Sequence, residues 1–216
     1  MNMKLYSYFR SSAAYRVRIA LNLKGLDYAY EAIHLLRDGG QQLKPEYRAL
    51  NPDGIVPTLI DGDDVLTQSL AIIEYLEETH PEPPLLPKSP SDRAFVRSVA
   101  MQVACEIHPL DNLRVLKYLK HQVKVPDEIK DAWYRHWVET GFEPLEKRLA
   151  NDRRVDALTF GDTPTVADLC LVPQVFNARR FGIDLSRFPT IERIADHACT
   201  IDAFAQAAPA QQPDAE

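Results

Sequence analysis

Two hydrophobic periods alternate along the first part of the chain. Apolar runs with a period of two predict strands at residues 5–9, 28–35, 58–60 and 65–67. Apolar positions three or four apart predict helices at residues 11–24, shortly before residue 51, and at 69–78. The resulting order is β-α-β-α-β-β-α, in which a crossover connection is followed by a hairpin. Such an order predicts a mixed sheet with helices packed on it.

Capping and turn residues mark the expected ends of these elements. Ser11 or Ser12 precedes the first helix and Gly25 follows it, as N-cap and C-terminal stop residues do. Ser69 is expected to cap the third helix in the same way. The polar turn at residues 61–63 reads DGD and predicts a hairpin.

Prolines separate this region from the rest of the chain. Five of them fall between residues 81 and 90, which predicts a linker and a domain boundary. We therefore predict a small α/β domain at residues 1–80, a linker at 81–90 and an all-helical domain at 91–216.

Every periodic segment after the linker has a helical period. A long helix is expected to open at Ser91, and others are expected at residues 127–151 and 190–199. Thr165 and Asp168 are spaced as a capping box at the start of a further helix. The tail from residue 205 is expected to form an extended arm.

Composition narrows the classes of function. The 216 residues carry a formal net charge of -6 and are 45% hydrophobic. No basic surplus favours a nucleic acid or an anionic membrane as partner, no apolar run approaches the roughly 20 residues of a membrane span, and the start lacks the features of a secretory signal. Three widely spaced cysteines, without metal-ligand spacing, predict a cytoplasmic protein with no metal site.

Three short segments of the first domain carry groups that suit a thiol peptide. The Arg-Ser-Ser turn at residues 10–12 opens a helix, whose N–H groups and positive dipole end stabilise a thiolate. Val56 precedes a proline whose bond is prone to be cis, and its backbone N–H and C=O could meet a peptide. Gln68 and Ser69 open a second helix and suit a carboxylate. Glutathione carries all three groups, although the serines could be plain N-caps and Gln68 a surface residue.

Several blocks of the sequence resemble the zeta-class glutathione transferases. The string SSAAYRVRIALNLKG at residues 11–25 is close to the family signature. Further blocks follow in the family's order: DGGQQ, ALNPDGIVPTL, QSLAIIEYLEE, HPLDNLRVLKYL and TVADLCLVPQVFNARRFGIDL. The resemblance runs from about residue 3 to residue 213. It implies an α/β plus all-α protein, with a thioredoxin-like N-terminal domain holding a mixed four-stranded sheet, a helical glutathione-transferase C-terminal domain, a homodimer, and glutathione as cosubstrate.

The resemblance also assigns roles to single residues. Ser11 would stabilise the thiolate, with Ser12 beside it. The residues that would hold glutathione are Gln42, Val56 through its backbone, Gln68, Ser69 and Asn112. Ala13 departs from the family, which has a cysteine there. A protein thiol at that place serves relatives that perform reductive dehalogenation, whereas isomerisation does not need it.

Arginines are the expected partners of the substrate's negative charges. Arg10 and Arg180 match arginines of zeta-class isomerases, and Arg114 resembles one in the related bacterial maleylpyruvate isomerases. Each could instead be a solvated surface charge. Arg16 and Arg18 are expected to be structural or surface charges on the first helix. Glu106 is expected either to reach the partner subunit's glutathione or to be an ordinary helix-surface carboxylate.

The activity implied by the resemblance is a glutathione-dependent cis–trans isomerisation of a small enedione diacid. The thiolate adds to the double bond of maleylacetoacetate, the bond rotates, and elimination leaves fumarylacetoacetate, a step of tyrosine and phenylalanine breakdown in family members. The alternative substrates are maleylpyruvate, which the presence of Arg114 supports, and small α-halo acids. A non-catalytic glutathione-transferase-like interaction module is an alternative of a different class, but such a module needs no intact polar shell for glutathione.

Overall fold

The computed structural model describes residues 3–216. Contacts divide the chain into a first unit, which runs to Leu85 and also includes Thr200–Glu216, and a second unit, Leu86–Cys199. The predicted boundaries assigned residues 200–216 to the second domain, and the structure differs from them there.

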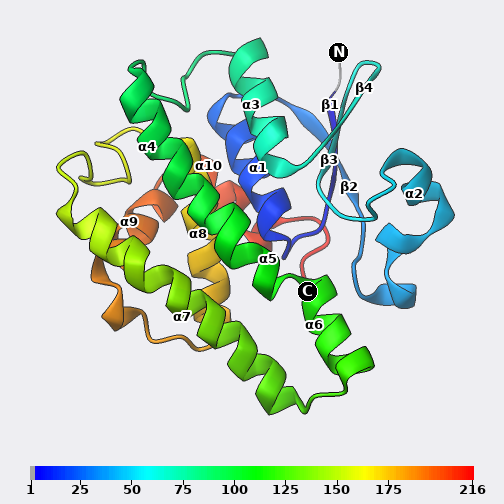
Figure 1. Cartoon of the computed structure of the whole chain (residues 1–216). Coiled ribbons are helices and arrows are strands. Elements are labelled where there is room, and N and C mark those ends of the chain that lie inside the picture. The colour runs from blue at the N-terminus through cyan, green and yellow to red at the C-terminus, as the bar shows by residue number, and fades with distance from the viewer. Residues whose placement is uncertain (1–2) are drawn as a thin grey trace. The chain divides into compact units, whose positions relative to one another are not determined.

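The first unit has a four-stranded sheet with helices on both of its faces. Its elements are β1 (Met3–Ser7), α1 (Ser12–Leu23), β2 (Tyr28–Ala32), the 3₁₀ turns η1 (Arg37–Gly39) and η2 (Gln41–Leu43), α2 (Pro45–Leu50), β3 (Thr58–Asp61), β4 (Asp64–Thr67) and α3 (Ser69–Thr79). The strand order is β2-β1-β3-β4, with β1 and β2 parallel and the other pairs antiparallel. Figure 1 shows α1 and α3 on one side of the sheet and α2 on the other. The expected mixed sheet is confirmed.

One row of residues crosses the sheet near the place where the predicted functional segments leave it. Tyr6 of β1 pairs with Glu31 of β2 and with Thr58 of β3, and Thr58 pairs with Thr67 of β4. Because β3 runs antiparallel to both β1 and β4, it begins where they end. We refer to this side of the sheet, which is formed by strand ends, as its edge. The turn before α1, the segment before β3 and the turn before α3 therefore meet the sheet at the same edge.

The two ends of α1 follow the predicted capping residues. Ser11 is the N-cap, and its Oγ accepts a hydrogen bond from the backbone N–H of Ala14 at 3.2 Å. Gly25 follows the helix with a φ of 63°, which a residue without Cβ adopts at no steric cost. Arg16 and Arg18 are buried within the unit, so the part of the expectation that made them surface charges is wrong.

The start of α3 differs from the prediction by one position. Ser69 is the first helical residue, and Gln68 takes the N-cap position with a φ of 68°. The Gln68 side chain makes no capping hydrogen bond, so the first N–H groups of α3 have no side-chain acceptor at the cap. The apolar pattern could not show this, because the left-handed backbone at Gln68 leaves no trace in it.

The second unit is helical, as predicted. Its elements are α4 (Pro90–Met101), the π-helical turn η3 (Gln102–Ile107), α5 (His108–Asp111), α6 (Leu113–Tyr118), the π-helical turn η4 (Leu119–Val123), α7 (Asp127–Asn151), α8 (Val166–Arg180), the 3₁₀ turn η5 (Leu185–Arg187) and α9 (Pro189–Cys199). Within this unit α8 packs against α4 and α9, and α7 packs against α5 and α9. The capping box of Thr165 and Asp168 is confirmed at the start of α8.

Two details of the first long helix in this unit differ from the prediction. Ser89, not Ser91, is the N-cap of α4, and its Oγ accepts from the N–H of Asp92 at 3.2 Å. The helical path then breaks at Asn112, whose extended backbone separates α5 from α6. Arg114 consequently lies on the short helix α6.

The C-terminal tail is not the extended arm that we expected. It forms α10 (Asp202–Ala207) and the 3₁₀ turn η6 (Pro209–Gln211). Arg18 donates from Nε to the carbonyl of Ala207 at 3.0 Å, and Asp214 accepts from the Phe9 N–H at 3.1 Å and from the Tyr30 hydroxyl at 2.6 Å. These contacts attach the tail to the segment after β1, to β2 and to α1, which explains why it belongs to the first unit.

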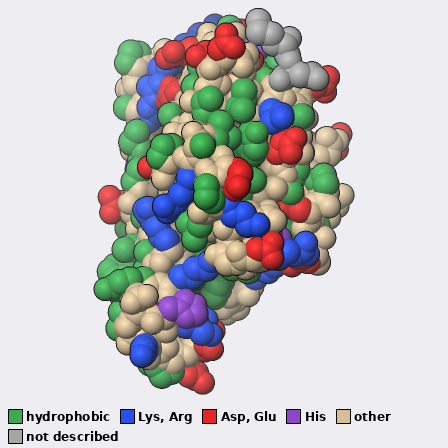
Figure 2. Space-filling model, turned by 90° about the vertical axis from the view of Figure 1, so that its right-hand side faces the viewer, with side chains coloured by type: hydrophobic (Ala, Val, Ile, Leu, Met, Phe, Trp, Pro, Cys, Tyr) green, Lys and Arg blue, Asp and Glu red, His purple; other side chains and the backbone are tan. Residues whose placement is uncertain are grey.

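The surface carries charges of both signs. On the face that Figure 2 shows, Lys and Arg side chains lie among Asp and Glu side chains. Within residues 3–216, no helix combines the length and the apolar character that a membrane span requires. The same residues contain no cluster of three or more His, Cys, Asp and Glu side chains that could hold a metal ion.

Arg18 should be a principal determinant of stability. Its guanidinium is fully buried and donates to Ser7 Oγ and to the carbonyls of Tyr8, Phe9 and Ala207. Arg18→Met should lower the free energy of unfolding by about 3–5 kcal/mol, because it leaves buried acceptors without donors. Chemical denaturation measures the change.

The matched control for this prediction is Arg48→Met on α2. Arg48 is exposed, and its replacement should change the free energy of unfolding by no more than about 0.5 kcal/mol. A loss below about 1 kcal/mol for Arg18→Met would show that the buried bonds contribute little net stability.

Candidate active site

The edge of the sheet at which β1 and β4 end holds three of the predicted segments. Ser11 follows β1, the Val56–Pro57 peptide bond precedes β3 and is cis, and Ser69 follows β4. The pairing of Tyr6, Thr58 and Thr67 fixes these segments at one edge. The segments predicted to meet a thiol, a peptide backbone and a carboxylate thus share one edge of the first unit.

Ser11 combines a partly exposed side chain with the start of a helix. Its Oγ accepts from the Ala14 N–H, which leaves the hydroxyl hydrogen for another acceptor. No acidic side chain lies in the first turn of α1, so nothing there offsets the positive end of the helix dipole. The geometry suits a thiolate placed against this turn.

Ser12 and Ala13 are the first two helical residues after Ser11. Ser12 is 5% exposed, so its side chain is turned into the fold. Ala13 is partly exposed, at the position where the resembled family carries a cysteine. Of the two serines, Ser11 is therefore the better placed to meet a ligand.

The backbone beside Val56 is fixed by hydrogen bonds from the side chains of Tyr47 and Asn51. The carbonyl of Ile55 accepts from the Tyr47 hydroxyl at 2.7 Å and from Asn51 Nδ2 at 2.9 Å. Both side chains also bond to Thr58 Oγ1, at 2.9 and 3.1 Å. Within residues 3–216, neither backbone group of Val56 has a hydrogen-bond partner. The loop is thus fixed, and although Val56 is only 6% exposed, its peptide N–H and C=O lack the partners that strand-like pairing with a peptide ligand would supply.

Ser69 and Gln68 lie where α1 approaches α3. Ser69 is 6% exposed, and its Oγ accepts from Nη1 of the buried Arg16 at 3.3 Å. The hydroxyl hydrogen of Ser69 therefore points away from the guanidinium and can be donated. With the uncapped N–H groups of α3, these groups suit a carboxylate.

Gln42 lies in η2, and its side chain is almost fully buried. Nε2 approaches the carbonyl of Leu35 at 3.5 Å, whereas Oε1 has no hydrogen-bond partner among residues 3–216. A buried amide oxygen without a partner costs free energy. This cost is consistent with a ligand donor or an ordered water at that place.

Arg10 is held by the C-terminal residue of the same unit. Its guanidinium lies over the ring of Phe9 with 4.7 Å to the centroid, and Nη2 approaches a carboxylate oxygen of Glu216 at 3.5 Å. Glu216 also meets His34 and Arg37. An endogenous carboxylate therefore lies against Arg10, which is consistent with the predicted role of this arginine in holding a carboxylate.

In the second unit, Arg180 is the last residue of α8 and is exposed. It stacks over the ring of Phe181 at 4.9 Å, and that ring stacks in turn on Tyr134 with 3.5 Å between centroids. Burial raises the pKa of Tyr134, the Asp111 carboxylate adds to the rise, and the Arg180 guanidinium opposes it. Asp111 accepts from Gln174 Nε2 at 2.9 Å. Arg180 therefore stacks on an aromatic pair whose buried member, Tyr134, lies close to Asp111, which in turn is bonded to Gln174.

The other predicted residues of the second unit lie on or near α6. Asn112 caps α6, because its Oδ1 accepts from the Arg114 N–H at 3.1 Å. Arg114 is exposed, and its guanidinium has no hydrogen bond or ion pair within residues 3–216. Glu106 is exposed in η3. The structure gives Asn112 a capping role, and its predicted contact with glutathione stays a prediction.

Five buried polar residues support these groups, and none of them was predicted to do so: Tyr47, Asn51, Arg16, Tyr134 and Gln174. A polar residue at such a position was the available signal, because a buried polar group needs a partner.

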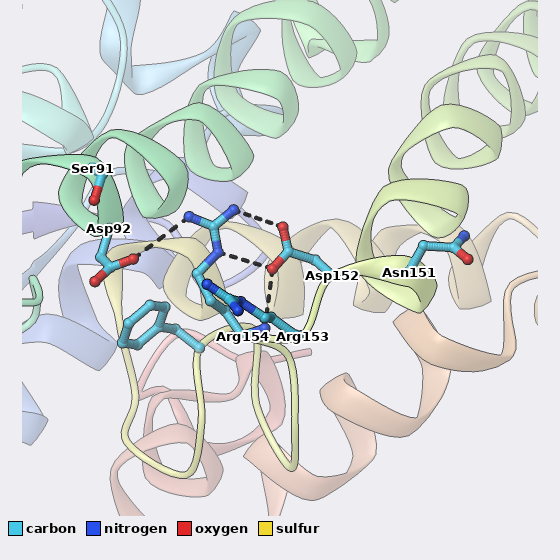
Figure 3. A pocket seen from close by; sticks show the side chains of 7 residues that line it. Ser91, Asp92, Asn151, Asp152, Arg153 and Arg154 are labelled. Carbon is cyan, nitrogen blue, oxygen red and sulfur yellow. Dashed lines mark hydrogen bonds and ion pairs between the residues drawn. The ribbon is translucent and has the colours of Figure 1, made fainter.

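A cavity of about 670 Å³ in the second unit does not contain any predicted site residue. Figure 3 shows Arg154 between two carboxylates, at 2.6 Å from Asp152 and 3.5 Å from Asp92. Hydrogen bonds from Arg154 lower the pKa of Asp152 to about 2. These charges already satisfy one another, so we do not assign the active site to this cavity.

Comparison with known proteins identifies the family. Residues 5–84 match the N-terminal domain of glutathione S-transferases. The structure of a maleyl pyruvate isomerase, described as a bacterial glutathione S-transferase of the zeta class, superimposes with a TM-score of 0.96 and 46% identity, covering 99% of this chain and 100% of that one. The chain belongs to the zeta-class glutathione transferase family.

Other relatives of this zeta-class chain carry a second name. A probable maleylacetoacetate isomerase of Vibrio cholerae is 51% identical over 100% of the chain and 99% of its own length. The structure of a maleylacetoacetate isomerase from Methylobacterium extorquens AM1, with bound malonate and glutathione, has a TM-score of 0.93 and 46% identity and covers 99% of both chains. The expected fold, a thioredoxin-like domain followed by a helical glutathione-transferase domain, is confirmed.

Ser11→Ala should raise the pKa of the thiol of bound glutathione by about one to two units, because it removes a hydrogen bond to a charged acceptor worth about 1.5–3 kcal/mol. The ultraviolet absorbance of the thiolate, titrated against pH, measures the shift.

Ser89→Ala is the matched control, since Ser89 caps α4 through the same contact with the backbone N–H three residues on. It should cost a similar amount of stability, about 1 kcal/mol, and leave the thiol pKa unchanged. If Ser11→Ala behaves like Ser89→Ala, Ser11 is only a cap and the thiolate is stabilised elsewhere.

Proposed function

We propose that this chain is a glutathione-dependent cis–trans isomerase that converts maleylacetoacetate to fumarylacetoacetate. The observation that carries the proposal is the edge of the first-unit sheet, where Ser11, the backbone of Val56 and the start of α3 at Ser69 offer groups for a thiol, a peptide and a carboxylate. Full-length relatives named maleylacetoacetate isomerase support the choice of reaction.

The residues at this edge fit glutathione group by group. The hydroxyl of Ser11 and the start of α1 would face the thiol, and Val56 would pair with the cysteinyl backbone. Gln68 and Ser69 would hold the γ-glutamyl carboxylate. Gln42 has a buried oxygen that needs a donor, which a peptide N–H can supply. Glutathione, when bound, supplies the sulfur that adds to the double bond and departs after rotation.

Ser11 and α1 provide enough stabilisation to ionise the thiol. A free thiol has a pKa of about 8.5, so only about 3% is ionised at pH 7. Lowering the pKa by about two units requires about 2.7 kcal/mol. A hydrogen bond from Ser11 to a charged acceptor contributes about 1.5–3 kcal/mol, and the helix end adds about 0.3–1 kcal/mol. No separate general base is needed.

Cations would hold the substrate and its developing charge. Addition of sulfur places negative charge on an enolate oxygen, and the diacid brings two carboxylates. Arg180 is exposed and its guanidinium is held by stacking on the Phe181 ring, which suits a contact with a carboxylate. Arg10 already holds a carboxylate in its own unit. Arg114 is exposed and is the third candidate.

Maleylpyruvate is the alternative substrate. The structural relative with a TM-score of 0.96 is a maleyl pyruvate isomerase, and Arg114 resembles an arginine of those enzymes. Both substrates require the same chemistry and differ in chain length. Small α-halo acids are a further alternative substrate class, for which glutathione itself would supply the sulfur; Ala13 rules out only reductive dehalogenation through a protein thiol at that position. A non-catalytic module has less support, since the polar groups of Ser11, Gln68 and Ser69 are those that such a module does not need.

The assembly and location rest on the family resemblance and composition. We infer a homodimer and a cytoplasmic location. In the dimer Glu106 would either reach the partner subunit's glutathione or be an ordinary helix-surface carboxylate. The three cysteines are free, with Cys105 and Cys199 exposed, and such thiols persist in a reducing compartment.

The two enedione diacids should be separated by glutathione-dependent turnover, measured side by side. We expect kcat/KM to be at least about tenfold higher for maleylacetoacetate than for maleylpyruvate, a difference of about 1.4 kcal/mol in transition-state binding. The reverse preference would reassign the native substrate. Binding of glutathione without turnover of either diacid would refute the isomerase.

Arg180→Ala should raise KM for the diacid by about tenfold and leave the affinity for glutathione unchanged, because it removes a charge-assisted contact with a carboxylate. Arg179→Ala is the matched control, since Arg179 is exposed beside it and pairs with Asp196 at 2.6 Å. Equal, small effects of the two variants would make Arg180 an ordinary surface charge.

A further inference from the structure

Arg16 places a buried positive charge behind the start of α3. The residue is 2% exposed and lies on α1, one turn after the turn that carries Ser11. Its Nη1 donates to Ser69 Oγ at 3.3 Å. A guanidinium keeps its charge when buried, and the low dielectric around it screens its field less than water would. The field therefore acts on whatever binds at Ser69.

Three effects at Ser69 all favour an anion. The first N–H groups of α3 have no side-chain cap from Gln68, and the helix dipole is positive at that end. Ser69 Oγ accepts from Arg16, so the hydroxyl is oriented to donate away from α1. The buried charge of Arg16 adds attraction that surface residues could not provide at this depth.

Arg18, two residues further on, shows what a buried arginine does when it only supports the fold. Its contacts are the Ser7 hydroxyl and the carbonyls of Tyr8, Phe9 and Ala207. All of these are neutral groups of the framework. Arg16 differs because it donates to a hydroxyl at a predicted ligand position.

We propose that Arg16 is a positioning residue for the γ-glutamyl α-carboxylate of glutathione: it orients the Ser69 hydroxyl and supplies the positive charge behind it. The proposal rests on the function proposed above, and it adds a residue that does not touch the ligand. Its consequence is specific, since only ligands that carry this carboxylate should depend on Arg16.

The test compares two ligands on two proteins. Glutathione and γ-aminobutyryl-cysteinyl-glycine share the thiol and both peptide groups, and only glutathione has the α-carboxylate. Calorimetric titration should show that Arg16→Met weakens glutathione by about tenfold or more and the analogue by less than about threefold, because the lost interaction is charge-assisted. Thermal unfolding of each protein checks the fold.

Arg16→Lys is the rescue variant, because lysine retains a cation on a flexible stem. The ratio of the two dissociation constants should stay close to that of the wild type. If Arg16→Met does not fold, Arg16→Gln replaces it, because glutamine lacks the charge: a ratio that falls towards one supports the proposal, and a ratio equal to that of the wild type overturns it.

Two other outcomes have separate meanings. Equal weakening of both ligands by Arg16→Met would overturn the proposal and leave Arg16 a purely structural residue. A wild-type protein that binds neither ligand would refute the proposed function itself, whereas wild-type binding with an unaffected Arg16→Met variant refutes only the role of Arg16.

Discussion

The buried guanidinium of Arg18 is the contact on which the geometry of the active-site edge depends. It holds the last residue of β1 and the two residues after it, and it holds the C-terminal segment through the carbonyl of Ala207. Burial lowers the pKa of Arg18, yet an arginine remains protonated in proteins. Three of its four hydrogen bonds thus fix the segment that leads into Ser11.

The two buried arginines of α1 divide structural and functional work between them. Arg18 satisfies framework acceptors, and Arg16 faces the helix start at Ser69. The sheet register brings both places to one edge, because β3 runs against β1 and β4. A single helix with inward-facing cations can therefore serve fold and ligand together.

Local features of the fold could be predicted from the sequence, and distant ones could not. The order of strands and helices, Ser11 as a cap and the capping box at Thr165 depend on neighbours within a few residues. The structure of the C-terminal tail was not predicted, because it depends on distant contacts such as the hydrogen bond between Asp214 and Phe9, which lie 205 residues apart in the sequence. For the site, the segments around Ser11, Val56 and Ser69 were found through strand and helix ends and the family resemblance. The supporting roles of Arg16, Tyr47 and Tyr134 could be assigned only from the structure, because the residues are buried and an apolar pattern does not show which groups they contact.

The placement of the tail makes the first unit discontinuous in sequence. Residues up to Leu85 and residues from Thr200 form one structure, and the whole second unit is inserted between them. During synthesis a ribosome releases the sheet and α1 long before Ala207 and Asp214, so Arg18 must wait for one of its acceptors. The first unit therefore cannot complete these contacts before residues 200–216 have been synthesised, unlike N-terminal domains that fold as they emerge.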